Sequence, residues 1–431
     1  MNIIYKILSR ARQPRAKLVY IALVLLLAVM ILFSRRPASF HNPQFWAEDG
    51  KVWYANAYNL GQFESLFLPQ DGYFQTLSRI TASGALLFDL SHAPRIFMIA
   101  AIIIQLLPVL LIVSGRLNNL IPSSSAKLFV ILLYLALPNS AEVFGNLTNA
   151  QWYLSLSAVL VLIAAIPVSR FWKFFDLSCV ALSGLSGPFS IFLFPISFLR
   201  WRRTRSPWSL KLMLVVAATA ILELSAIIFL SHNSRAHYLP QFQPSLLLGI
   251  LNRQVFLGLL LGSKGFLWLQ THFVFSRVVF NLTAVLGIFL TAYALVKSTF
   301  ELRLFIIFAG LILAAGLLSP TLTDTSKPVW ETLYNSSAGI RYWLIPMCAF
   351  LAILVWGVTK RNPVVVRSLS GILLASMIFG ISFDWRHWEL GDLNFPAAVI
   401  NFRNAPAGRK VLFPLNPPGW SKEPWMELTK R

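Results

Sequence analysis

Long apolar runs recur along almost the whole chain, and they constrain its fold more than any other feature. The first, Leu18 to Phe33, is about as long as a bilayer requires if Lys17 and Arg35 reach the two interfaces. A hydrophobic fraction of 57% with only 12% charged residues exceeds what a water-soluble core needs. We therefore expect an all-α membrane protein, a polytopic bundle of about 10–12 transmembrane helices. The further runs are 96–113, 128–137, 152–166, 177–199, 210–230, 246–269, 278–296, 304–318, 342–358 and 364–381.

The basic residues indicate how such a bundle is oriented. Short basic segments lie at the N-terminus, near residues 170, 203 and 362, and at 297–303, and the positive-inside rule assigns them to the cytoplasm. Most of the 16 acidic residues lie in the intervening segments. We predict a multi-pass protein of a bacterial cytoplasmic (inner) membrane with a cytoplasmic N-terminus, a retained signal anchor and an exoplasmic active site. The net charge of +21 is then explained by basic residues that set the orientation in the membrane and bind anionic lipid headgroups. We expect no nucleic-acid partner.

This orientation divides the chain into a membrane domain, residues 1–383, and a short exoplasmic tail, residues 384–431. Residues 34–90 form the first outer loop, and parity favours an amphipathic helix at the interface for 73–90. The alternative is a true second span, which would move Glu142 to the cytoplasm. The run 177–199 is interrupted by Gly187-Pro188, which predicts two short helices with the break beside a cavity. The outer segments are 34–74, 138–150, 231–244, 319–339 and the tail.

The acidic pair Glu48-Asp49 begins the first outer loop, in a chain that has few acids. A carboxylate there can act as a general base on a hydroxyl or hold a divalent cation against a phosphate. Adjacent side chains point in different directions, so the two have different roles. We expect Asp49 to be the catalytic base, because Gly50 permits close approach of a ligand, and Glu48 to support it. The plainer interpretation is a solvated turn at the interface.

Other polar and aromatic residues of the outer segments are candidates for substrate binding. Amides and an aromatic face near Glu142 suit sugar hydroxyls and a pyranose ring, and outer arginines suit a phosphate. For Trp152 and for the arginines, anchoring at the membrane interface is the alternative. Neither the histidines nor the cysteines show a metal-ligand spacing, so we predict no metal ligand. The candidates are Arg79, Tyr73, Glu142, Asn149, Gln151, Trp152, Arg341, Tyr342 and His237.

The order of these parts resembles the GT-C superfamily of integral-membrane glycosyltransferases. The segment WAEDG, with Glu48-Asp49, is similar to the acidic motif after the first span of its members, and residues 54–90 match their interfacial helices. Glu142 corresponds to a second acidic residue in the next outer loop. The sequence RYW at Arg341 is similar to an Arg-Tyr pair at the head of a late span.

The resemblance implies an inverting transferase that moves a sugar from a polyprenyl-phosphate donor to a glycan, lipid or protein acceptor. Asp49 would be its general base, and Arg341 or Arg79 would hold the donor phosphate. The sequence departs from the family because no large soluble domain follows the last span and no second DxD-type motif is present. We therefore predict no firm cofactor and favour a metal-independent enzyme, while a divalent cation, Mg²⁺ or Mn²⁺, stays open.

Two other classes of protein compete with the enzyme. A transporter or flippase of lipid-linked sugars should show internal repeats with matched broken helices, and no clear repeat is seen. A polysaccharide polymerase or ligase would place its key arginines in large outer loops. The outer loops of this chain are modest, and that class leaves Glu48-Asp49 unexplained.

Overall fold

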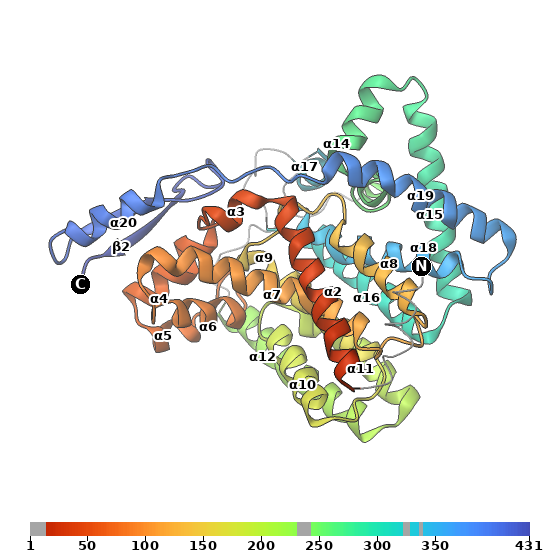
Figure 1. Ribbon diagram of the computed structural model, residues 1–431, viewed down its shortest axis with the longest axis horizontal. Helices are drawn as coiled ribbons and strands as arrows, with labels where there is room; N and C mark the ends of the chain where they lie inside the picture. The colour runs from red at the N-terminus through yellow and green to blue at the C-terminus, as the bar shows by residue number, and fades with distance from the viewer. Residues whose placement is uncertain (1–13, 231–242, 322–327, 336–338) are drawn as a thin grey trace.

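The protein is a bundle of helices with one small sheet near the C-terminus (Figure 1). The computed structural model describes residues 14–230, 243–321, 328–335 and 339–431. Within these residues, seven helical segments are long and apolar enough to cross a membrane, which confirms the predicted all-α polytopic class. They are α2 (Pro14–Arg35), α7 (Ala93–Val113), α12 (Pro207–Phe229), the continuous segment Pro244–His272, α15 (Ser276–Lys297), α16 (Phe300–Leu318) and α19 (Val364–Asp384).

The centre of the bundle is built from shorter helices. In α9 (Leu147–Ile163), every residue except Thr148 is buried, and the helix packs against α7, α16 and α18 (Arg341–Gly357). Its 17 residues rise about 25 Å, less than the ~30 Å hydrocarbon core of a bilayer. The expected 10–12 spans therefore include helices that fall short of full spanning length. The others are α8 (Ser124–Leu135), α10 (Arg170–Gly184) and α11 (Phe189–Thr204), and the break between α10 and α11 falls at the predicted Gly187-Pro188.

The first loop, residues 34–90, folds into short helical pieces rather than a span. The longest, α6, has 10 residues and rises about 15 Å, half the thickness of a bilayer core. The alternative of a second span in 73–90 is therefore wrong. Exposed apolar side chains in this loop, among them Phe63, Phe67 and Phe88, are typical of helices at a membrane interface. The pieces are α3 (Pro37–His41), η1 (Asp49–Tyr54), α4 (Ala55–Asn59), α5 (Gln62–Leu66), α6 (Thr76–Ala85) and the 3₁₀ turn η2 (Leu90–His92).

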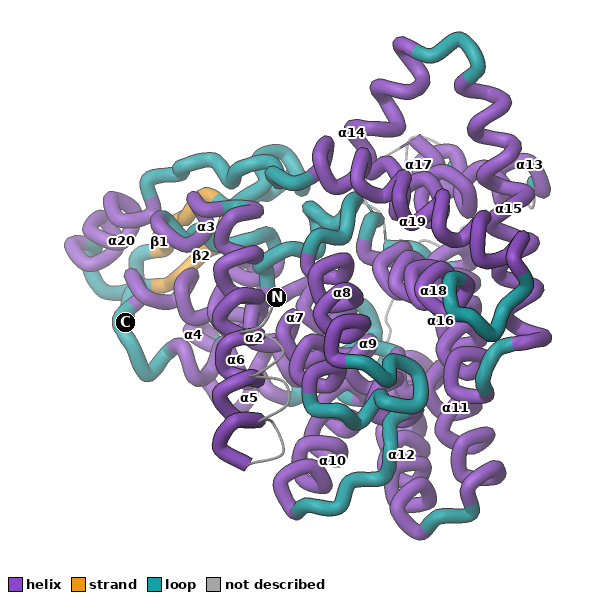
Figure 2. Tube along the Cα trace, turned by 45° about the vertical axis from the view of Figure 1, so that its right-hand side comes forward, coloured by secondary structure: helices purple, strands orange, loops and turns teal. Residues whose placement is uncertain are grey.

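The tail packs back onto this loop. It contains α20 (Phe395–Asn404) and an antiparallel pair of strands, β1 (Lys410–Pro414) and β2 (Trp425–Thr429), which lie beside α4 in both views (Figures 1 and 2). The backbone N–H of Ala47 donates to the carbonyl of Asn416 at 2.6 Å. A Cβ on Gly50 would come within 2.6 Å of Leu415. Gly50 thus admits the tail, not a ligand as expected, and the tail shares its core with the first loop.

The predicted run 246–269 is not one straight helix. It is divided into α13 (Pro244–Ile250), the π-helical η3 (Leu251–Phe256) and α14 (Leu257–His272), with left-handed backbone at Gly262 (φ 68°). A Cβ on Gly249 would meet the ring of Tyr334, and a Cβ on Gly262 would meet the carboxylate of Asp384, so both halves lie beside segments that were predicted to face outward. The run remains one continuous helical segment long and apolar enough to cross a membrane, but it is bent rather than straight. The tip between α14 and α15 projects from the body of the protein (Figures 1 and 2).

Candidate active site

The carboxylate of Asp49 lies at the N-terminal end of α9. It accepts hydrogen bonds from the backbone N–H of Leu147 at 3.1 Å and from the N–H and hydroxyl of Thr148, both at 2.7 Å. The first N–H groups of a helix have no partner within it, and they carry the positive end of its dipole, so a carboxylate is well placed there. Burial raises the pKa of Asp49 to about 7, against the opposing effect of these three hydrogen bonds. Asp49 therefore holds the first loop onto the central helix.

Glu48 and Asp49 point to different places, as expected, but with their anticipated positions reversed. Glu48 lines a large cavity, whereas Asp49 is 2% exposed and is absent from the cavity wall. A base must reach its substrate, and the oxygens of Asp49 are occupied by Leu147 and Thr148. The expected assignment of Asp49 as the base that contacts substrate does not agree with this geometry. Glu48 has the access that the role requires.

This cavity, hereafter the acidic cavity, encloses about 970 Å³. One wall carries Glu48, Asp71, Glu142 and Arg341, and Arg341 is the one basic residue among the described residues that line it. Another part of the lining consists of apolar side chains from three helices, α11, α12 and α16. The volume is at the upper end of the range of about 300–1,000 Å³ usual for ligand sites. The apolar wall comprises Ile191, Phe192, Ile227, Leu311, Ile312, Ala314, Ala315 and Leu318.

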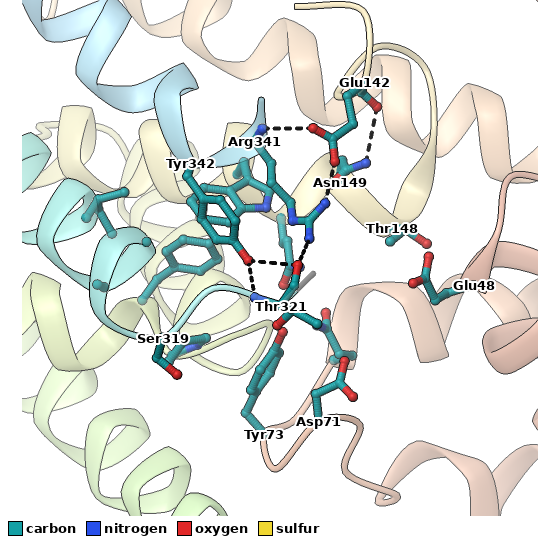
Figure 3. A pocket seen from close by; sticks show the side chains of 18 of the residues that line it. Glu48, Asp71, Tyr73, Glu142, Thr148, Asn149, Ser319, Thr321, Arg341 and Tyr342 are labelled. Atoms are coloured by element: carbon teal, nitrogen blue, oxygen red, sulfur yellow. Dashed lines mark hydrogen bonds and ion pairs between the residues drawn. The ribbon is translucent and has the colours of Figure 1, made fainter. Parts of the chain in front are cut away.

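Glu142 and Arg341 form an ion pair in the polar wall (Figure 3). The backbone N–H of Arg341 also donates to Glu142 Oε2 at 3.2 Å, so the carboxylate meets both the start of α18 and its first side chain. The guanidinium donates to the carbonyl of Thr321 at 2.6 Å. Asn146 and Asn149 hold the backbone of Glu142, donating to its carbonyl at 2.7 and 3.1 Å. The orientation of Arg341 is therefore constrained from two sides.

The loop that carries Glu142 is anchored by arginines at the end of the first helix. Arg36, which is 1% exposed, donates to the carbonyls of Ala141 at 2.8 Å and Phe144 at 3.1 Å. Arg35 donates to the carbonyl of Leu137 at 2.9 Å. These bonds connect segments about 100 residues apart in the sequence, and they fix where Glu142 stands.

Most of the substrate-binding candidates meet at the acidic cavity. The ring of Trp152 contacts Phe189 and Tyr342 edge-on, at centroid distances of 5.0 and 5.4 Å. The hydroxyl of Tyr342 accepts a hydrogen bond from the N–H of Thr321 at 2.7 Å. Pro188 and Phe189 also line the wall, which confirms that the break between α10 and α11 lies beside a cavity. The candidates found there are Tyr73, Glu142, Asn149, Gln151, Trp152, Arg341 and Tyr342.

Two candidates are not brought to the cavity wall. Arg79 is 1% exposed, and its guanidinium lies over the ring of Trp53 at 5.2 Å, with no hydrogen-bond partner among the described residues. Burial lowers its pKa to about 10. Trp53 lines the cavity and Arg79 does not, so the binding of a phosphate by Arg79 stays a prediction that this cavity does not support. His237 lies outside the described residues.

Several wall residues were not anticipated. Asp71 faces the cavity across from Arg341 (Figure 3), at a turn where Asp71 and Gly72 have φ values of 52° and 84°. The sequence signal that could have identified Asp71 is an acidic residue next to a glycine in a chain with few acidic residues. Tryptophans from two segments that are distant in the sequence are also in contact, since the ring centroids of Trp46 and Trp388 lie 5.4 Å apart. The aromatic residues that were missed are Trp46, Trp53, Trp388 and Trp420.

The three carboxylates of the wall do not form a compact ligand set. Within the part of the chain that the structure describes, no group of three His, Cys, Asp or Glu residues is placed to hold a metal ion. Glu142 is already paired with Arg341. The wall therefore presents separated carboxylates around one guanidinium.

Comparison with known proteins gives one distant structural match. No family model and no curated protein matches the chain. The structure is similar to the crystal structure of the Archaeoglobus fulgidus oligosaccharyltransferase in the apo form, with 12% sequence identity and a TM-score of 0.42. The match covers 90% of this chain and 58% of that chain, so this chain spans less than two thirds of its length. Roles of individual residues do not transfer at this identity.

Proposed function

We propose that this multi-pass membrane protein is a glycosyltransferase that moves a sugar from a polyprenyl-phosphate donor to a glycan, lipid or protein acceptor. The proposal rests chiefly on the lining of the acidic cavity, which combines Glu48 and Arg341 with an apolar wall from α11, α12 and α16. A lipid-linked anionic donor needs both a cation for its phosphate and a slot for its chain. An acceptor hydroxyl additionally needs a base.

Arg341 is proposed to bind the donor phosphate. A guanidinium can offer parallel N–H donors to phosphate oxygens, and it stays charged at any working pH. Glu142 and the carbonyl of Thr321 hold the group in place before substrate arrives. The polyprenyl chain would lie along the apolar wall between α11, α12 and α16. Charge that develops on the departing phosphate would then face a preoriented cation.

Glu48 is proposed to be the general base. Burial raises its pKa above the usual value for glutamate, with Arg341 acting in the opposite direction. A raised pKa makes the carboxylate a better proton acceptor at the pH of a cell envelope. Glu48 takes the proton of the acceptor hydroxyl, the hydroxyl oxygen forms a bond to the anomeric carbon, and the bond from that carbon to the phosphate oxygen breaks. Polyprenyl phosphate leaves with the electron pair of the broken bond. The configuration at the anomeric carbon of the sugar is inverted.

The acceptor is proposed to enter past the tryptophans of the first loop and the tail. Trp388 is 42% exposed and lies beside Trp46, and Trp420 lines the same cavity. Indole faces pack well against the apolar face of a pyranose ring, with the hydroxyls left to polar neighbours. We place this mouth on the exoplasmic side of a bacterial inner membrane, because the basic turns lie at the other ends of the helices.

Purified protein supplied with radiolabelled polyprenyl-phosphate sugars, one at a time, tests the proposal. Labelled product and free polyprenyl phosphate should appear together with the wild type, and Glu48→Gln should form both about 10²–10⁴-fold more slowly. Movement of intact labelled donor across a liposome membrane, without cleavage in any combination of donor and acceptor, would favour a flippase and overturn the proposal. The anomeric configuration of the product checks the inversion.

A further inference from the structure

A second cavity, of about 610 Å³, lies at the other end of the same central helices. The acidic cavity includes Thr148 at the start of α9 and Leu318 at the end of α16. The second cavity includes Ile163 at the end of α9 and Leu302 near the start of α16. On α9 the acidic cavity reaches Trp152 and the second cavity begins at Leu156, four residues or about 6 Å further along the helix. The second one has no part in the proposed transfer reaction.

The interior of this cavity is apolar. Its walls come from α8, α9, α16 and α18 and include Leu156, Leu160, Phe305 and Leu351. The binding free energy of an apolar pocket is most favourable for an apolar ligand, because apolar surface is removed from water or from loose contacts with lipid. A small hydrophilic anion would leave these walls unoccupied. The interior thus selects a hydrocarbon chain.

The rim of the cavity is basic and carries no acid. Lys360 and Arg361, in the turn between α18 and α19, are exposed, and the structure gives neither an ion pair among the described residues. No Asp or Glu is among the described residues that line this cavity. The acids at this end are already paired with other arginines, Asp176 with Arg116 and Glu301 with Arg200. The positive charge of the rim is therefore available to an anionic group.

We propose that this basic-rimmed cavity binds one anionic phospholipid of the surrounding bilayer. Its phosphate lies between Lys360 and Arg361, and one acyl chain enters the apolar interior between α9, α16 and α18. A cluster of basic residues beside an apolar pocket between membrane helices is suited to such a headgroup. A zwitterionic phospholipid has the same acyl chains, but its headgroup also carries a positive charge. The basic rim should therefore bind the anionic phospholipid more tightly than the zwitterionic one. This inference does not depend on the glycosyltransferase proposal.

Native mass spectrometry of the full-length protein tests the inference. The protein is released from mixed micelles that contain phosphatidylglycerol and phosphatidylcholine with the same acyl chains. We expect one phosphatidylglycerol to be retained in preference to phosphatidylcholine. Lys360→Gln/Arg361→Gln should weaken that retention roughly 30-fold, from the loss of two basic residues at the membrane surface. Ala352→Trp, which fills the interior, should abolish retention while leaving the rim charged.

The matched control is Arg202→Gln/Arg203→Gln, an exposed basic pair at the end of α11 that does not line this cavity. It removes the same charge and should change retention less than about twofold. A phosphatidylglycerol with a photoreactive acyl chain should label peptides from α9 or α18. Equal retention of phosphatidylcholine, equal loss in the control, or labelling elsewhere would overturn the proposal. Displacement by equimolar polyprenyl phosphate would assign the cavity to that lipid and would also overturn it.

Discussion

The carboxylate of Asp49 accepts hydrogen bonds from the backbone N–H and from the hydroxyl of Thr148, each at 2.7 Å. The two residues lie 99 positions apart in the sequence, and their contact joins the first loop to the start of α9. Since Asp49 is committed to this contact, its neighbour Glu48 is the member of the acidic pair that lines the cavity. The two acids therefore lie in different places, Asp49 in a contact between segments and Glu48 at the cavity wall.

Substitution of each acid should affect a different measurement. Asp49→Asn places an amide N–H₂ opposite a backbone donor of α9, and we expect it to lower the free energy of unfolding by about 1–3 kcal/mol. Glu48→Gln should leave thermal unfolding in detergent unchanged and lower kcat by about 10²–10⁴-fold. If instead Asp49→Asn abolished turnover at unchanged stability while Glu48→Gln stayed active, Asp49 would be the base.

The pH dependence of the reaction should report Glu48. A protonated carboxyl cannot accept a proton from the acceptor hydroxyl, so kcat/KM should fall as the pH drops through the pKa of Glu48. Burial raises that pKa, so the acidic limb should lie above 4.5, the usual value for glutamate. Glu48→Gln should remove the limb from the residual activity, whereas Asp49→Asn should retain it. A limb that survives in Glu48→Gln would assign it to another group.

The Glu142–Arg341 pair should act as a unit on donor binding. Arg341→Lys keeps the charge but loses the planar fork, so it should raise the KM for the donor more than it lowers kcat. In a double-mutant cycle with Glu142→Gln and Arg341→Gln, kcat/KM should show a coupling of about 0.5–3 kcal/mol.

A second ion pair provides the control for this cycle. Asp89 and Arg403 are about half exposed and lie outside the cavity wall. Asp89→Asn and Arg403→Gln should show little coupling in the same assay, as is usual for surface pairs. Additive effects of the Glu142 and Arg341 substitutions would contradict the proposed partnership.

Trp388 should affect the acceptor rather than the donor. Loss of one stacking face in Trp388→Ala should raise the KM for the acceptor by roughly 2–12-fold, the equivalent of about 0.5–1.5 kcal/mol. Trp388→Phe should restore most of the affinity, because it keeps an aromatic face. Trp268, which is 48% exposed and lies away from the cavity, is the matched control. An unchanged KM in Trp388→Ala would exclude this residue from the acceptor path.

The sequence predicted which segments meet at the cavity better than it predicted how their side chains point. Tyr73 and Glu142 come from different outer segments, and they line one cavity because helices of alternating direction return their connecting loops to the same end. Arg79 is absent from the wall and packs over the ring of Trp53, a contact that no local sequence pattern indicates. Hydropathy located the run 246–269, but it did not reveal the bend, because the positive φ of Gly262 has no hydropathy signal.

The apolar runs by themselves determined a helical membrane protein, because a chain in lipid must satisfy its own backbone hydrogen bonds. Charge and composition also indicated candidate residues for chemistry, and most of these candidates line the acidic cavity. Only the tertiary structure decided between the two adjacent acids, since Glu48 and Asp49 have the same chemistry and the same local sequence. The unpaired N–H groups at the N-terminus of α9 bind the carboxylate of Asp49, whereas the side chain of Glu48 lines the cavity.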